Sequence, residues 1–374
     1  MKNIHFNFSL SFALVSAVQA LLMIFFPVYL EQIGKTNSDI ALITGIEGPA
    51  IIFGPVLLGL IISRLKDQAR ILFHLSFFSA VCFLPVVYGY SLLLIISFYF
   101  ISQLFFRTAV SRFSDLVVRS DARGLVSFSK TRVWGSISYL LLGILVGKII
   151  DATSTKVVPY AILFLLSFVA INFESKYSRV ENLDIKKMFI RPSANSFFII
   201  LSSMLSWMAH APIYTYLSLY LIDLGYSNTL TAILWNIGVF SEILFFIVFS
   251  RIEKRLSLKM ILVISQLMTV VRWLILSEYQ NLELLIFAQL LHAFSFAGVY
   301  LSIVKMGNVS LSRDGYDNPQ TILISFGIGV GVLLGKIFCF ILSHYTSNYQ
   351  LMFFAAGIVS TISLLIAFVV KNNE

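Results

Sequence analysis

Long apolar runs dominate this sequence and restrict the folds open to it. A helix needs about 20 residues to cross a hydrocarbon core about 30 Å thick. Twelve runs have roughly that length: 8–30, 39–62, 70–89, 91–118, 128–150, 157–173, 195–221, 229–250, 259–277, 282–307, 319–344 and 350–370. Only 12% of the residues are charged, against about 25% in soluble domains. We therefore expect an all-α polytopic membrane protein with twelve transmembrane helices.

The longest connection, 174–194, divides the spans into six and six. Tyr29-Leu30, Gly34 and Asn37 of the first half reappear at the same spacing as Tyr220-Leu221, Gly225 and Asn228 of the second. Six spans followed by six in the same orientation form a parallel repeat of two bundles, with the substrate held between them. We expect an N-terminal bundle over 1–173, a cytoplasmic linker over 174–194 and a C-terminal bundle over 195–374.

Lysine and arginine in the loops indicate the orientation, because cytoplasmic loops carry an excess of both. Only Lys35 and Lys156 fall on one side of the membrane. The other side carries Lys2, Arg64, Lys66, Arg70, Arg119, Arg123, Lys176, Arg179, Lys186, Lys187, Arg191, Arg251, Lys254, Arg255, Lys259, Arg313 and Lys371. We expect a multi-pass protein of the plasma (bacterial inner) membrane with both termini cytoplasmic. The basic residues are dispersed, so the net charge of +9 does not indicate nucleic-acid binding.

Two glutamates and two arginines lie deep within the predicted spans. A charge near the bilayer centre costs at least ~2.5–3.5 kcal/mol and usually marks a substrate or proton pathway. Glu242 and Arg272 occur on consecutive spans and suggest one polar site, joined directly or through a third group. Glu47 lies beside Gly45 in a segment that we expect to be a loosened helix, where it either serves a pathway or pairs, protonated, with a hydroxyl. Arg107 has no acid nearby in its own span and is a candidate for binding an anion.

Other polar residues have both structural and functional interpretations. Asp115 can form an internal salt bridge with Arg119, four residues on. His210 and His292 lie near the midplane, where histidine can serve as a proton switch or as an ordinary hydrogen-bonding group. Tyr214 follows His210 by one turn. Lysines towards span ends are expected to extend their amines to the interface; these are Lys148, Lys305 and Lys336.

The block FSKTRVWGS at 128–136 resembles a motif of the major facilitator superfamily, in the branch of lactose permease-like and phenylpropionate permease-like transporters. The resemblance continues through WMAHAPIYTYLSLYLIDLGYS, ILWNIGVFSEILFF, VVRW and QLLHAFSF in spans seven to ten. It implies a major facilitator fold. It also implies that Arg132 and Asp115 contribute to substrate binding, and that Glu242, Arg272 and His292 form a proton-coupling network. Ser295 stands where lactose permease-like members carry a further carboxylate, and Glu242 or Glu47 could carry the proton in its place.

These observations predict a secondary transporter that works by alternating access, most simply proton-coupled symport of a small organic solute. An aromatic or other organic acid suits the resemblance and the arginines. A sugar or nucleoside is the alternative, because Trp134 or Trp235 could stack on it, and an efflux carrier would share most of these features. A polytopic membrane enzyme or a non-transporting receptor is a further alternative. The sequence has no P-loop, nucleophile elbow or zinc motif, so we expect no catalytic residues, metal or cofactor. The expected partners are the substrate, protons and lipid, with a functional monomer.

Overall fold

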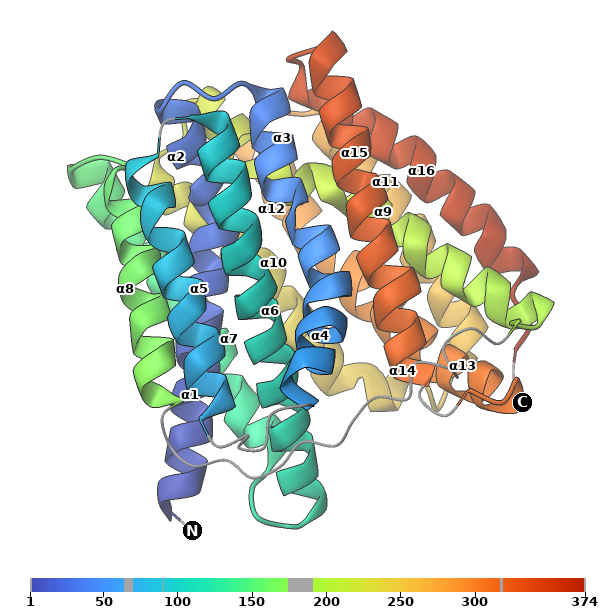
Figure 1. The fold of residues 1–374 in the computed structure, drawn as a ribbon. Coiled ribbons are helices and arrows are strands. Elements are labelled where there is room, and N and C mark those ends of the chain that lie inside the picture. The colour runs from blue at the N-terminus through green and yellow to red at the C-terminus, as the bar shows by residue number, and fades with distance from the viewer. Residues whose placement is uncertain (1, 64–69, 90, 174–190, 317–318, 373–374) are drawn as a thin grey trace. The chain divides into compact units, whose positions relative to one another are not determined.

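The computed structural model describes residues 2–63, 70–89, 91–173, 191–316 and 319–372. The described residues form helices and no strands, which confirms the all-α expectation. Within them, eleven helical stretches are long and apolar enough to cross a membrane, and the sixth predicted span is the shorter apolar helix α8 (Val157–Asn172). The sequence runs therefore correspond to helices throughout (Figure 1).

The chain divides into two compact units. The N-terminal unit comprises Met1–Asn182 and Leu221–Ile233, and the C-terminal unit comprises Leu183–Tyr220 and Leu234–Glu374. Most of the linker predicted over 174–194 lies outside the described residues, as do residues 64–69 of the basic loop after the second span.

Eight helices build the first part of the N-terminal unit. They are α1 (Lys2–Ile24), α2 (Phe26–Gln32), α3 (Asn37–Gly45), α4 (Glu47–Ser63), α5 (Ile71–Tyr88), α6 (Leu92–Ala122), α7 (Phe128–Ala152) and α8. Helix α1 packs on α7 and α8, while α6 packs on α4 and α5. The second predicted span is interrupted between α3 and α4, so that Glu47 begins a new helix. Glycine permits the close contact of α4 with α6, since a Cβ at Gly54 would lie 2.8 Å from the Leu104 carbonyl oxygen.

The C-terminal unit takes most of the remaining helices. They are α9 (Ala194–Asp223), α10 (Asn228–Ile252), α11 (Leu258–Glu278), α12 (Leu282–Leu290), η2 (Ala293–Gly298), α13 (Val299–Arg313), α14 (Pro319–Ile322), η3 (Leu323–Gly329), α15 (Val330–Tyr345) and α16 (Tyr349–Val369). The segments η2 and η3 are π-helical. Helix α11 packs on α16, η2 and α13. Helix α15 lies close to α9, because a Cβ at Gly331 would lie 2.5 Å from the Met204 carbonyl oxygen.

One carboxylate fixes the start of α10 within the N-terminal unit. Asp151, near the end of α7, accepts hydrogen bonds from the backbone N–H groups of Asn228 (2.8 Å) and Thr229 (2.9 Å) and from both of their side chains. An acidic group at a helix N-terminus satisfies free N–H donors and complements the helix dipole. This cap gives a physical reason for the first residues of α10 to group with the N-terminal unit.

Candidate functional site

A buried arginine organises the polar centre of the C-terminal unit. Arg272, on α11, is 1% exposed. Its Nη1 donates to His292 Nδ1 (3.0 Å) and to Ser295 Oγ (2.8 Å), and its Nη2 donates to Gln289 Oε1 (3.1 Å). Its Nε–H is also buried and has no hydrogen-bond partner among the described residues. The guanidinium is thus held by neutral acceptors.

Glu242 meets this arginine through His292. A guanidinium can only donate hydrogen bonds, so His292 Nδ1 must accept and the neutral ring carries its proton on Nε2. That Nε2 lies 3.8 Å from Glu242 Oε2. The sequence predicted that Glu242, Arg272 and His292 work together, and the structure brings all three into one line of polar groups.

A π-helical turn positions the acceptors of Arg272. The segment η2 begins directly after His292 and contains Ser295. A π-turn inserts an extra residue per turn and is frequent at functional sites. Gly298 at its end leaves no room for a side chain against α11, since a Cβ there would lie 2.2 Å from Ser265 Oγ. Gly238 similarly lets α10 approach His292. A Cβ added at Gly238 would lie 3.3 Å from the nearest atom of His292.

Aromatic rings surround the other histidine of the unit. The Tyr214 ring stacks between Trp207 and Trp235, with ring centroids 6.5 and 6.3 Å away. The His210 ring lies 6.1 Å from Tyr214 and 6.2 Å from His292. Three predicted substrate residues, His210, Tyr214 and Trp235, therefore lie in one cluster beside the charged network. Trp235 is buried and donates its Nε1–H to Ser218 Oγ (3.0 Å).

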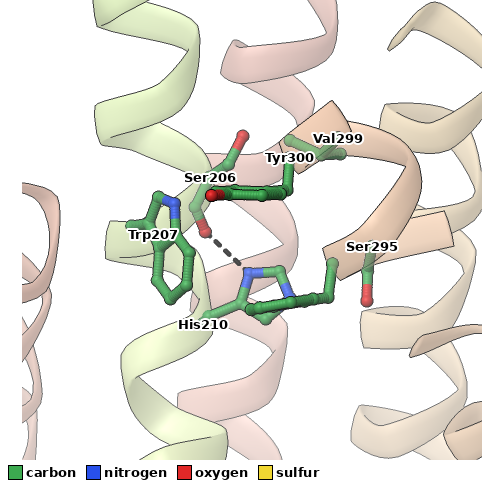
Figure 2. A pocket seen from close by; sticks show the side chains of 7 residues that line it. Ser206, Trp207, His210, Ser295, Val299 and Tyr300 are labelled. Atoms are coloured by element: carbon green, nitrogen blue, oxygen red, sulfur yellow. Dashed lines mark hydrogen bonds between the residues drawn. The ribbon is translucent and has the colours of Figure 1, made fainter. Parts of the chain in front are cut away.

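A small pocket opens beside His210. Figure 2 shows Ser206, Trp207 and His210 from α9 on one side, and Ser295, Val299 and Tyr300 from η2 and α13 on the other. Phe296 also lines it. Apolar rings and a few polar atoms line this pocket.

A second charged cluster lies in the N-terminal unit. Arg107 Nη2 donates to Glu47 Oε2 (2.9 Å), and Tyr99 Oη donates to Glu47 Oε1 (2.9 Å). The Arg107 and Glu47 side chains are 16% and 19% exposed. The acid that Arg107 lacks in its own span is thus supplied by α4.

The other predicted site residues of this unit make their contacts outside the Arg107–Glu47 pair. Asp115 forms its ion pair with Arg119 (3.0 Å), and the Arg132 guanidinium lies over the Phe128 ring, 5.9 Å from its centroid. The Trp134 side chain is 52% exposed. The contribution of Asp115 and Arg132 to substrate binding, which the family resemblance implied, stays a prediction.

Several polar partners were not predicted. Tyr99 and Gln289 are uncharged residues within apolar runs, and only their contacts with Glu47 and Arg272 single them out. The expectation that Lys336 extends to the interface is wrong. This residue is 5% exposed, and its Nζ donates to Thr215 Oγ1 (2.8 Å) because α15 packs closely on α9 and encloses the amine.

Comparison with known proteins agrees with this architecture. The model of the MFS_1 like family matches residues 5–355. The chain belongs to that family. It is 26% identical over 338 residues to the probable 3-phenylpropionic acid transporter of Escherichia coli (strain K12), covering 87% of each chain.

Solved structures show the same fold. The nucleoside transporter NupG superposes with a TM-score of 0.80 at 14% identity, over 98% of each chain. A bacterial homologue of the iron transporter ferroportin in an inward-facing state superposes with a TM-score of 0.72 at 14% identity, over 99% of this chain and 98% of that one. The protein is therefore a multi-pass membrane transporter of the major facilitator type and not an enzyme.

Proposed function

We propose that this transporter carries out proton-coupled symport of a small aromatic or other organic acid. One observation carries the proposal: Arg272 is fully buried, all its hydrogen-bond acceptors are neutral, and the nearest carboxylate of its network is Glu242, beyond His292. A buried cation is stabilised by an anion. An anionic substrate can supply one in the transport cycle.

Coupling follows from charge balance. With Glu242 ionised, the network of Arg272, His292 and Glu242 has no net charge, and a substrate carboxylate would make it negative. When Glu242 binds a proton, the positive charge of Arg272 is no longer balanced, and the carboxylate binds more tightly. By thermodynamic linkage, bound substrate favours protonation of Glu242 by the same factor. The state with both ligands is then neutral and suited to reorientation.

The aromatic preference is supported by the stacked rings of Trp207, Tyr214 and Trp235 beside this network. It is also supported by the similarity to the probable 3-phenylpropionic acid transporter of Escherichia coli. The NupG structure is only 14% identical, so the likeness concerns the fold and gives no support for a nucleoside.

We also propose the bacterial inner membrane as the location, with both termini in the cytoplasm. The lysine and arginine distribution among the loops supports that orientation. The proposed partners are the substrate, protons and lipid, and the proposed working form is a monomer.

Uptake into proteoliposomes with an imposed pH gradient tests the proposal. The assay compares labelled 3-phenylpropionate with uridine and a disaccharide. We expect accumulation of the aromatic acid, driven by external acidity and lost when the gradient is collapsed. Glu242→Gln should lose gradient-driven accumulation and retain exchange of internal for external substrate, because exchange needs no net proton movement.

Glu253→Gln is the matched control, since Glu253 follows the end of α10 and pairs with Lys305 outside the network. It should accumulate substrate like the wild type. Accumulation by the wild type that ignores the pH gradient would refute proton coupling, and transport of uridine in place of the acid would refute the substrate class.

A further inference from the structure

One histidine in the pocket lining has a buried ring nitrogen that makes no hydrogen bond to the described residues. His210 is 3% exposed, and its Nδ1 lies 2.7 Å from the carbonyl oxygen of Ser206, as drawn in Figure 2. Its Nε2 has no hydrogen-bond partner among the described residues. Buried polar atoms are nearly always paired, so an unpaired one in a pocket calls for an explanation.

The fixed contact determines what Nε2 can bind. A carbonyl oxygen can only accept, so His210 Nδ1 must carry the proton and donate it to Ser206. The buried ring lies beside His292, which holds the Arg272 guanidinium. A second positive charge is opposed by both burial and that guanidinium, so the imidazole is neutral. Its Nε2 therefore presents a lone pair and needs a donor.

The neighbouring pocket residues do not supply this donor. The Ser206 hydroxyl donates to the Ser202 carbonyl oxygen (2.7 Å) and accepts from Gln266 Nε2 (2.6 Å). Ser295 Oγ accepts from Arg272 Nη1 (2.8 Å), and no hydrogen bond joins its hydroxyl to the ring. Trp207 and Tyr300 also line the pocket and carry an indole N–H and a phenol O–H, but neither pairs with His210 Nε2.

We infer that His210 Nε2 is a specificity-determining acceptor, and that the preferred substrate is an aromatic acid whose ring carries a hydrogen-bond donor, a hydroxyl or an amine. The substrate ring packs against Trp207, Phe296 and Tyr300, and the ring-borne donor reaches Nε2. This inference rests on the proposed function, in which Arg272 balances the charge of the substrate carboxylate. The hydrogen-bond donor to Nε2 must then come from another part of the substrate.

Matched ligands can isolate this one hydrogen bond. The probes are 3-phenylpropionate, its three ring-hydroxylated isomers, and the corresponding methoxy compounds, which keep the oxygen but cannot donate. Affinity is measured on purified full-length protein by isothermal titration calorimetry. We expect the best hydroxylated isomer to bind roughly 3- to 10-fold more tightly than its methoxy counterpart, as expected for one net hydrogen bond.

Variants assign the effect to His210. His210→Phe removes the acceptor and should bring the hydroxy-to-methoxy ratio to about one, while His210→Gln, which retains an acceptor oxygen, should recover part of it. His344→Phe changes an exposed histidine at the end of α15 and should leave the ratio unchanged. Thermal unfolding of each variant identifies those that fold.

The outcomes separate the two proposals. Equal binding of hydroxy and methoxy ligands by the wild type overturns the inference. This result is expected if a water molecule donates the hydrogen bond to Nε2. An unchanged preference in folded His210→Phe also overturns it. Failure of the wild type to bind any of the aromatic acids overturns the proposed substrate class itself.

Discussion

Two deep arginines, Arg107 in the N-terminal unit and Arg272 in the C-terminal unit, are neutralised differently. Arg107 is in direct contact with Glu47, which also accepts from Tyr99, and both charged side chains are partly exposed. Arg272 is fully buried and contacts neutral acceptors, with Glu242 beyond His292. The N-terminal cluster is therefore a complete ion pair, while the C-terminal cluster leaves its charge balance open to a proton or an anion. This difference leads us to place coupling in the C-terminal unit.

The largest expected effect is on stability when each arginine is replaced. Arg272→Gln leaves three buried acceptors without their donor, and each such group costs roughly 1–3 kcal/mol. We expect a loss of about 3 kcal/mol or more. Arg107→Gln leaves Glu47 with Tyr99 and some access to solvent, so we expect a loss of roughly 1–2 kcal/mol. Thermal and denaturant unfolding of the purified variants measures both losses.

Arg119→Gln is the control, because its ion pair with Asp115 is about one third exposed and such pairs contribute little. An Arg107→Gln variant that unfolds more readily than Arg272→Gln would contradict the comparison, since it would place the more demanding buried charge in the N-terminal unit.

The sequence could predict the helices and the Asp115–Arg119 pair within one of them, but not the partners that lie on other helices. Each apolar run is a local signal, and the lipid requirement converts it into a helix. The partner of Arg107 comes from another span, Glu47, and no local spacing indicates which spans pack together. Lys336 was misassigned for the same reason, because its burial depends on the packing of α15 against α9.

The sequence left open whether Glu242 and Arg272 are joined directly or through a third group, and the structure places His292 between them. The π-turn η2 was not predicted, because no local spacing in the apolar run 282–307 distinguishes it from an α-helix. Family resemblance identified the three residues of the network. Ser295 departs from the family pattern, and in the structure its hydroxyl oxygen accepts a hydrogen bond from Arg272.

A smaller effect is expected in double-mutant cycles, which measure direct coupling between two side chains. For Glu47→Gln with Arg107→Gln we expect about 1 kcal/mol or more of coupling, because the atoms are 2.9 Å apart. For Glu242→Gln with Arg272→Gln we expect about 0.5 kcal/mol or less, since His292 intervenes. The measurement is the unfolding free energy of each single and double variant.

Replacing His292 sharpens that test. In a His292→Ala background the coupling of Glu242 with Arg272 should change, while the coupling of Glu47 with Arg107 should stay the same. Stronger coupling in the C-terminal pair of the otherwise native protein would show that the two clusters are neutralised alike, and the comparison would fail.

The smallest expected effect concerns Asp314, which lies outside the two clusters. Asp314 follows α13 and accepts from the Ser193 backbone N–H (3.0 Å) and hydroxyl (3.1 Å), beside the start of α9. Partial burial raises the pKa of Asp314, but hydrogen bonds from Ser196 and Ser193 outweigh it and hold the net pKa below the usual value. A depressed carboxyl pKa stabilises the fold above the unfolded-state pKa of about 3.9 and loses that contribution as pH falls through the folded-state value.

We therefore expect Asp314→Asn to lower the unfolding free energy by roughly 0.3–1 kcal/mol near neutral pH. The difference from the wild type should be constant between about pH 7 and pH 5 and should shrink below about pH 4, as the carboxyl group takes up its proton. Ser193→Ala should give a smaller change with the same pH dependence, because the backbone donor remains. A difference that grows as the pH falls would mean that this carboxyl group is not stabilised by its helix contact.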